Sequence, residues 1–122
     1  MPHSRRVLIV DDEPQMGHLV SLCLDHLDVE VTVAANLAGA LAEARVGGVG
    51  LVLLDLALGD EDGLEILPRL RADAALAGVP VVAFTAHDSR RAEALRSGVD
   101  SFLSRPFQAR DLRATVEVHL VR

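Results

Sequence analysis

The 122-residue sequence has no lysine, tryptophan or tyrosine, one cysteine and three phenylalanines. The lone Cys23 has no partner for an internal disulfide, and no cysteine and histidine cluster has zinc-site spacing, so we expect a reducing, cytoplasmic environment. Three aromatic residues are too few for a stacking platform, and a net charge of -6 disfavours direct contact with nucleic acid. No apolar run approaches the roughly 20 residues of a membrane span, so no membrane contact is expected.

The composition that is present is typical of a folded domain. Half of the residues are hydrophobic and a quarter are charged, which excludes a disordered or low-complexity chain. The length suits one domain, and we expect residues 1–122 to form it. All twelve basic residues are arginine, a compositional bias that bears on one site residue below.

Five short apolar runs predict strands, and the second of them is rich in β-branched residues. Four of the five lack an alternation of polar and apolar residues, as is typical of strands that are covered on both faces. The predicted strands are residues 7–10, 29–35, 49–54, 80–84 and 101–103.

Helical spacing of apolar residues separates these strands. The apolar patterns of the predicted helices run over residues 16–27, 37–44, 64–70, 92–95 and 112–120, and Gly47-Gly48 and Gly98 end the second and the fourth helix. Pro68 falls inside the third pattern and predicts a kink or a late start there. Strict alternation of strands and helices indicates an α/β fold, a flavodoxin-like (βα)5 doubly wound parallel five-stranded sheet of order 2-1-3-4-5.

Polar residues follow four of the predicted strands. Ligands of such a sheet bind outside the carboxyl ends of the strands, where the strand order reverses. Asp11 and Asp12 follow the first strand, Asp55 the third, Thr85 the fourth and Arg105 the fifth. Three clustered carboxylates repel one another, so we expect a hard divalent cation, Mg²⁺, to neutralise them.

Simpler interpretations exist for each of these residues taken alone. An aspartate after a strand often caps the next helix, and Asp11 or Asp12 could do so. However, two strands end in acidic residues where the strand order reverses, and the next two strands end in a hydroxyl and a cation. This combination favours a binding site over helix capping. Cys23 is expected to be a buried structural thiol, and His87, near the same edge, is more often structural than functional.

In this order and spacing, the motifs resemble the receiver domain of bacterial two-component response regulators. VLIVDDE at 7–13 resembles its first strand with an acidic pair, and LLDL at 53–56 followed by GDEDG at 59–63 resembles its phosphoacceptor loop. VAFTA at 82–86 resembles its switch-hydroxyl strand, and SFLSRPF at 101–107 its basic residue before a usually cis proline. The resemblance covers the whole chain.

The resemblance implies a phosphoacceptor in signalling, not an enzyme, beyond autocatalytic phosphotransfer and autodephosphorylation. Asp55 would accept a phosphoryl group from a histidine kinase or a histidine phosphotransfer protein. Asp12, Asp55 and the backbone carbonyl of Ala57 would bind Mg²⁺, with Asp11 acting mainly through a bound water. The small Ala57 side chain is expected to leave the site open to small phosphodonors and to water.

The resemblance also implies a switch. The Thr85 hydroxyl would donate to a phosphoryl oxygen, and Phe102 would turn inward to fill the space that Thr85 leaves. This movement would reshape the face of the fourth helix, fifth strand and fifth helix, which meets partners. Ala92, Leu95 and Val99 could supply an apolar patch there for a homodimer.

The chain departs from the family pattern at Arg105, because the family usually has lysine there. Arginine is a planar fork of donors that can bind phosphate bidentately, whereas lysine is a compact ammonium. Arg105 would therefore either clamp the phosphoryl group or pre-pair with Asp55. Alternatively, phosphorylation is slow or lost and the chain is a phosphorylation-independent docking module. The acidic residues 60–62 are expected to favour the start of the third helix rather than to bind metal.

Two other classes share an α/β sheet. An Mg²⁺-dependent phosphohydrolase would usually have a D-x-D arrangement, which Asp55-Leu56-Ala57 lacks. A flavodoxin-like electron carrier would have a hydroxyl-rich phosphate loop rather than an acidic one. The sequence is compatible with a stand-alone receiver domain and with a receiver domain that is joined to an output domain in a longer chain.

Overall fold

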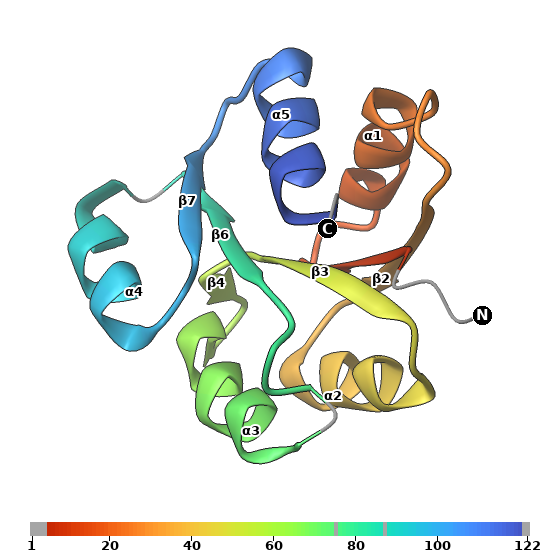
Figure 1. Cartoon of the computed structure of the whole chain (residues 1–122). Helices are drawn as coiled ribbons and strands as arrows, with labels where there is room; N and C mark the ends of the chain where they lie inside the picture. Colours follow the sequence, from red (N-terminus) through yellow and green to blue (C-terminus); the bar gives the residue numbers. More distant parts are fainter. Residues whose placement is uncertain (1–4, 75, 87, 121–122) are drawn as a thin grey trace.

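The fold was obtained as a computed structural model, which describes residues 5–74, 76–86 and 88–120 (Figure 1). Its centre is a parallel five-stranded sheet of order β2-β1-β3-β6-β7. The strands are β1 (Arg6–Val10), β2 (Glu30–Ala34), β3 (Val49–Leu54), β6 (Val81–Thr85) and β7 (Ser101–Ser104). Because β4 and β5 form a separate hairpin, this order is the predicted 2-1-3-4-5, and the flavodoxin-like fold is confirmed.

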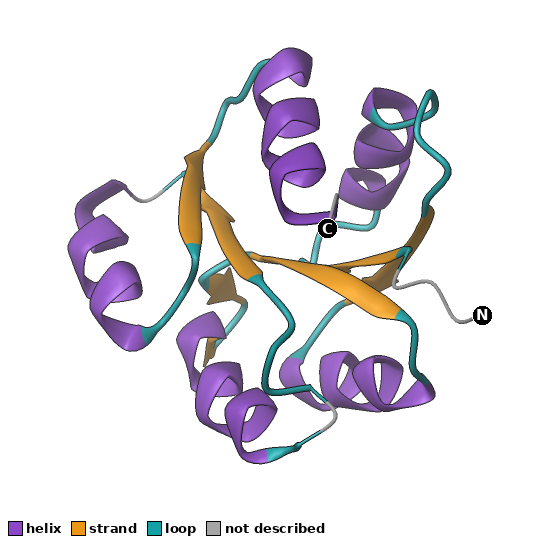
Figure 2. Ribbon diagram, in the orientation of Figure 1, coloured by secondary structure: helices purple, strands orange, loops and turns teal. Residues whose placement is uncertain are grey.

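Helices cover both faces of this sheet (Figure 2). The α-helices are α1 (Gln15–Cys23), α2 (Leu37–Val46), α3 (Ile66–Ala72), α4 (Arg91–Ser97) and α5 (Ala109–Leu120). Helices α1 and α5 lie on one face, and α2, α3 and α4 lie on the other. None of the described helices is long and apolar enough to cross a membrane.

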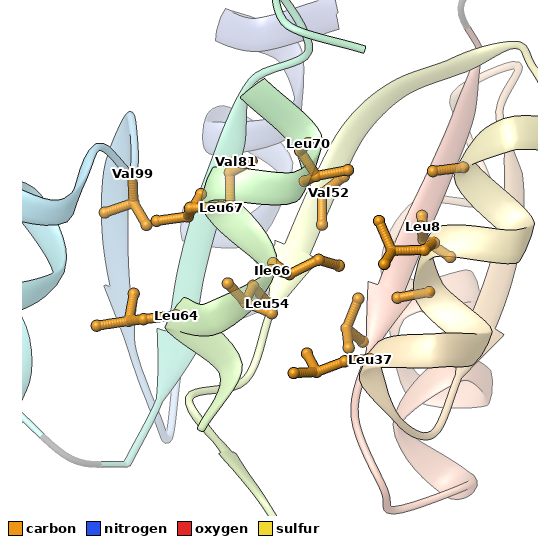
Figure 3. Close-up of a cluster of buried hydrophobic side chains, with 14 of the residues drawn as sticks. Leu8, Leu37, Val52, Leu54, Leu64, Ile66, Leu67, Leu70, Val81 and Val99 are labelled. Carbon is orange, nitrogen blue, oxygen red and sulfur yellow. The ribbon is translucent and has the colours of Figure 1, made fainter. Parts of the chain in front are cut away.

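The apolar side chains divide into two clusters, one on each face of the sheet. The larger cluster joins α2 and α3 to alternate residues of the central strands, including Leu8, Val52 and Leu54 (Figure 3). The other joins α1 and α5 to the intervening residues, among them Leu53 and Phe84. Because successive strand residues point to opposite faces, a strand covered on both sides must be apolar throughout. This explains the absence of alternation in the central runs.

Two helices differ from their sequence-based limits. The first was expected to continue to Leu27, but it ends at Cys23, and residues 24–26 form a turn. Leu24 and Leu27 still reach the apolar cluster from that turn, which is why their spacing resembled a helix. The late start at Pro68 is confirmed: a 3₁₀ turn (Gly63–Glu65) precedes α3, and Pro68 lies in the first turn of α3, where the backbone N–H groups have no intrahelical acceptor.

The predicted apolar patch near α4 needs a correction. Leu95 is exposed, but Val99 is buried and belongs to the larger cluster with Ala94. The periodicity of so short a helix did not identify which face is covered. Val99 therefore cannot belong to an exposed dimer surface.

Candidate functional site

The carboxyl ends of β1 and β3 bring the predicted acidic residues together. The Asp11 N–H donates to the Ala34 carbonyl, and the Asp55 N–H donates to the Val10 carbonyl, each at 2.9 Å. These bonds continue the parallel ladders one residue beyond the strands. The backbone positions of both aspartates are therefore fixed by the sheet rather than by a loop.

Three carboxylates form a compact cluster at this edge. One oxygen from each of Asp11, Asp12 and Asp55 lies within 4.8 Å of the other two. Asp11 and Asp55 are buried, whereas Asp12 is exposed. Burial raises the pKa of the Asp11 carboxyl, against the opposing effects of the Glu13 N–H and of Arg105. Such a cluster stays ionised only if cations compensate it.

The Asp11 carboxylate tests whether a metal fits. Its Oδ1 accepts a hydrogen bond from the Glu13 N–H at 2.9 Å, so it braces the turn after β1. Its Oδ2 is buried and accepts no hydrogen bond from the residues that the structure describes. A buried carboxylate oxygen without a donor is costly. Clustered carboxylate oxygens are ligands that Mg²⁺ prefers, and a buried one without a hydrogen bond can gain from a cation, so these residues fit that ion.

A short hairpin that the sequence analysis missed follows Asp55. Strands β4 (Ala57–Leu58) and β5 (Glu61–Asp62) pair antiparallel, and Gly59 in the turn has a φ of 64°. Gly63 returns the chain against the backbone of Asp55, since a Cβ at Gly63 would overlap the Asp55 carbonyl oxygen. The Ala57 N–H donates to Asp55 Oδ1 at 3.1 Å. Strands of two residues have no periodic signal, which explains the omission.

Arg105 extends from the end of β7 into the acidic cluster. Its Nη2 donates to Asp55 Oδ2 at 2.7 Å and lies 3.4 Å from Asp11 Oδ2. Nη1 lies 3.5 Å from Glu13 Oε1, and the guanidinium carbon lies 4.9 Å from the centre of the Phe84 ring. The peptide bond between Arg105 and Pro106 is cis, as the resemblance implied. Arg105 is thus a cation held at the acidic cluster by three carboxylates and a ring face.

The two predicted switch residues lie on adjacent strands. Thr85 is fully buried as the last residue of β6, and its carbonyl accepts from the Arg105 N–H at 3.0 Å. Phe102 of β7 is only partly buried, and the guanidinium carbon of Arg91 lies 5.5 Å from its ring centre. His87, also considered above, lies outside the described residues.

Two of the three hairpin carboxylates have structural partners, and Asp62 lies at the start of the third helix, as expected. Asp62 Oδ1 accepts from the Leu64 N–H at 3.1 Å and caps the 3₁₀ turn before α3. Glu61 Oε1 accepts from the Leu37 N–H at 3.0 Å, at the start of α2. Asp62 also pairs with Arg90 through two hydrogen bonds. The contacts of Glu61 and Arg90 had no signal in the sequence, because they join residues that only the fold brings together.

Sequence comparison places this site in a known family. Residues 7–117 match the response regulator receiver domain. The chain is 39% identical over 111 residues to the transcriptional regulatory protein TrcR of Mycobacterium tuberculosis, covering 89% of this chain and 42% of that protein. It is 36% identical over 118 residues to the sensory transduction protein RegX3 of Mycolicibacterium smegmatis, covering 95% and 50%. The chain thus spans about half the length of these curated relatives.

Solved structures have the same fold. A putative response regulator from Chloroflexus aurantiacus superposes with a TM-score of 0.87 at 27% identity, covering all of both chains. The receiver domain of NtrX from Brucella abortus superposes with a TM-score of 0.83 at 30% identity, covering 93% of this chain and 97% of that one. With the parallel sheet and the acidic cluster at its carboxyl edge, these matches show that the chain belongs to the response regulator receiver domain family of two-component systems.

Proposed function

We propose that this receiver domain accepts a phosphoryl group on Asp55 from a histidine kinase or a histidine phosphotransfer protein. A carboxylate oxygen of Asp55 attacks phosphorus, the new O–P bond forms as the N–P bond of the phosphohistidine breaks, and the imidazole nitrogen leaves with the bonding pair. The observation that carries this proposal is the three-carboxylate cluster, in which a buried Asp11 oxygen accepts no hydrogen bond from the described residues and lies 3.4 Å from Arg105 Nη2.

Mg²⁺ is the cation we propose for this cluster. Asp12, Asp55 and the Ala57 carbonyl would hold it, with Asp11 acting through a bound water. When bound, Mg²⁺ neutralises negative charge that builds on the phosphoryl oxygens. The chain's own groups do the rest. The β1 and β3 ladders orient Asp11 and Asp55, and the Ala57 N–H fixes one Asp55 oxygen at 3.1 Å.

The response to phosphorylation is proposed to start at Thr85. Its hydroxyl would donate to a phosphoryl oxygen, and Phe102 would turn into the space that Thr85 leaves. Phe102 is partly buried, so its inward rotation would add apolar burial on the β7 edge. The face made by α4, β7 and α5 would then present a different surface to partners. A transcriptional output domain in a longer parent chain is proposed only from the names of the relatives.

Arg105 supports a second candidate function. Its 2.7 Å bond to Asp55 places a fixed positive charge where a phosphoryl group and a metal must both be accommodated. If that pair does not open, the chain acts as a docking module without phosphorylation. If it opens, the guanidinium clamps the phosphoryl oxygens instead. The Phe84 ring supports the guanidinium in the arrangement that is paired with Asp55.

Acetyl phosphate as donor tests the proposal. Wild-type protein is incubated with acetyl phosphate and Mg²⁺ or with EDTA, and then treated with hydroxylamine, which cleaves acyl phosphates. We expect the protein to gain a phosphoryl group only when Mg²⁺ is present, and we expect hydroxylamine to remove that group. Labelling that is independent of metal, or that resists hydroxylamine, would contradict the proposal. Sustained turnover of a small phosphoester would favour a phosphohydrolase instead.

Arg105→Lys separates the two candidates. If wild type labels, Arg105 supports the chemistry, and the lysine variant changes only rates. If wild type fails and Arg105→Lys labels, the site is intact but closed by the guanidinium, and the docking function is favoured. An Mn²⁺ titration followed by electron paramagnetic resonance gives a separate readout, because removal of the Arg105 fork should tighten metal binding.

A further inference from the structure

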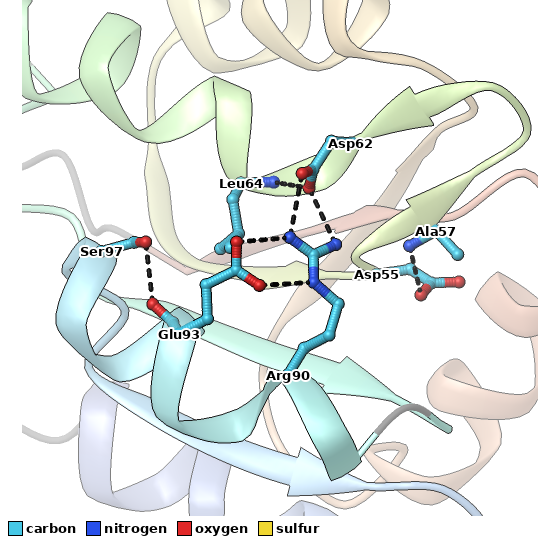
Figure 4. A network of polar contacts seen from close by, with 7 residues as sticks. All are labelled: Asp55, Ala57, Asp62, Leu64, Arg90, Glu93 and Ser97. Carbon is cyan, nitrogen blue, oxygen red and sulfur yellow. Dashed lines mark hydrogen bonds and ion pairs between the residues drawn. The ribbon is translucent and has the colours of Figure 1, made fainter.

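Arg90 joins two elements that flank the acidic cluster. Its Nη1 and Nη2 donate to Asp62 Oδ1 and Oδ2 at 3.0 and 2.9 Å, on the hairpin that follows Asp55 (Figure 4). Its Nε and Nη2 donate to Glu93 Oε1 and Oε2 at 2.9 and 3.0 Å, in the first turn of α4. One guanidinium therefore bridges two carboxylates that are 31 residues apart in sequence.

The electrostatics agree with this geometry. The hydrogen bonds from Arg90 lower the pKa of the Asp62 and Glu93 carboxyls, and those carboxyls raise the pKa of Arg90. All three side chains keep substantial contact with solvent, so the bridge adds little to global stability. Instead, the two hydrogen bonds that Arg90 makes to each carboxylate fix the orientation of the guanidinium relative to both of them.

Helix α4 has little else to hold it. Within Arg91–Ser97, Ala94 is the one buried residue, and the helix begins without a side-chain cap. A hollow of about 310 Å³ lies against the hairpin, with Asp62 and Arg90 both on its wall. Leu58 of the hairpin and Ala94 of α4 both belong to the larger apolar cluster, and the polar bridge adds a hydrogen-bonded connection between the hairpin and the start of α4.

We propose that Arg90 is a positioning residue that couples the hairpin after Asp55 to helix α4. When the hairpin shifts, the rigid Asp62–Arg90–Glu93 bridge carries α4 with it, in addition to any route through Thr85 and Phe102. The tether itself is independent of the phosphoryl chemistry, but its use in signalling rests on the proposed function.

Amide hydrogen exchange measured by NMR tests the tether in the metal-free protein. Arg90→Gln and Asp62→Asn should both speed exchange at Ala57–Asp62 and at Arg91–Ser97, by about twofold to fivefold, the range that an exposed ion pair gives. An asparagine at position 62 keeps the oxygen that caps the 3₁₀ turn, so a lost cap does not explain the effect. Arg91→Gln is the matched control, because it removes an adjacent charge that contacts Phe102 rather than the hairpin.

Unchanged hairpin exchange in Arg90→Gln would overturn the tether, as would equal loosening of both elements in Arg91→Gln. Addition of Mg²⁺ tests the coupling. In wild type it should slow exchange in the hairpin and alter it in α4, whereas in Arg90→Gln only the hairpin should respond. An equal response of α4 in both proteins would overturn the coupling. No response of the wild-type hairpin would contradict the proposed metal site, while the metal-free comparison still decides the tether.

Discussion

Strands β3 and β7 end at the same edge of the sheet, but they are packed very differently. Every residue of β3 is buried, whereas every residue of β7 is only partly buried. The neighbouring helices show the same contrast, since α2 buries four residues and α4 buries one. The centre of the sheet is therefore tightly packed, and the β7–α4 edge is thinly packed.

This contrast divides the proposed site into a fixed half and a movable half. Asp55 follows β3, so the proposed phosphoacceptor stands at the end of a strand that is buried throughout. Arg105 and Phe102 belong to the thin edge, where a change in position disrupts fewer contacts. Elements with few buried contacts open at low free-energy cost, as a conformational response requires. The packing thus favours phosphorylation at the end of β3 and a conformational change at β7 and α4.

The largest predicted effect compares two leucines of the same apolar cluster. Leu53 of β3 is fully buried, and Leu103 of β7 packs against that cluster from the edge. We expect Leu53→Ala to lower the free energy of unfolding by about 3 kcal/mol, and Leu103→Ala by roughly 1 kcal/mol, because less buried volume is lost. Urea unfolding monitored by circular dichroism measures both. Equal losses would contradict the contrast between centre and edge.

A smaller effect is expected at the start of α2. Asn36 Oδ1 accepts from the Gly39 N–H at 2.8 Å, whereas α4 begins without a side-chain cap. Asn36→Ala should lower the free energy of unfolding by about 1 kcal/mol. Asn36→Ser should lower it much less, because serine also caps a helix well. Urea unfolding again provides the measurement. The interpretation fails if serine and alanine prove equally destabilising.

The smallest effect concerns one ionisation at the thin edge. The hydrogen bonds from Arg90 hold the pKa of Asp62 below its ordinary value of 3.8. A carboxyl with a lowered pKa stabilises the fold above that value, and the stability is lost as the pH falls through its folded pKa. Arg90→Gln should raise the pKa of Asp62, seen in an NMR titration of its carboxyl carbon. The control Arg91→Gln should not, and an equal rise in both would contradict the pairing.

The sequence predicted the fold where patterns are long and local. The apolar run before Asp55, the strand before Thr85 and the strict alternation with helices were enough for the topology. The predicted end of the first helix was wrong because a turn places Leu27 at helical spacing. The predicted apolar patch was wrong because a helix as short as α4 has too few residues to show which face is covered. In both cases tertiary packing, not local preference, determines what is covered.

The candidate site was predictable to the extent that topology alone brings residues together. Strand ends fix Asp11 and Asp55 at one edge, and the cluster is where the strand order predicted it. The pairing of Arg90 with Asp62 was not predictable, because a long side chain can reach many partners and only the fold selects one. The roles of Asp55, Thr85, Arg105 and Phe102 stay predictions.

Intact-mass spectrometry with acetyl phosphate and Mg²⁺ tests the central claim most directly. The comparison uses wild type, Asp55→Asn and the matched control Asp60→Asn, which changes an exposed carboxylate in the hairpin turn. We expect wild type and Asp60→Asn to gain the mass of one phosphoryl group, and Asp55→Asn to gain none. Full labelling of Asp55→Asn would show that the phosphoacceptor is another residue and would contradict the account.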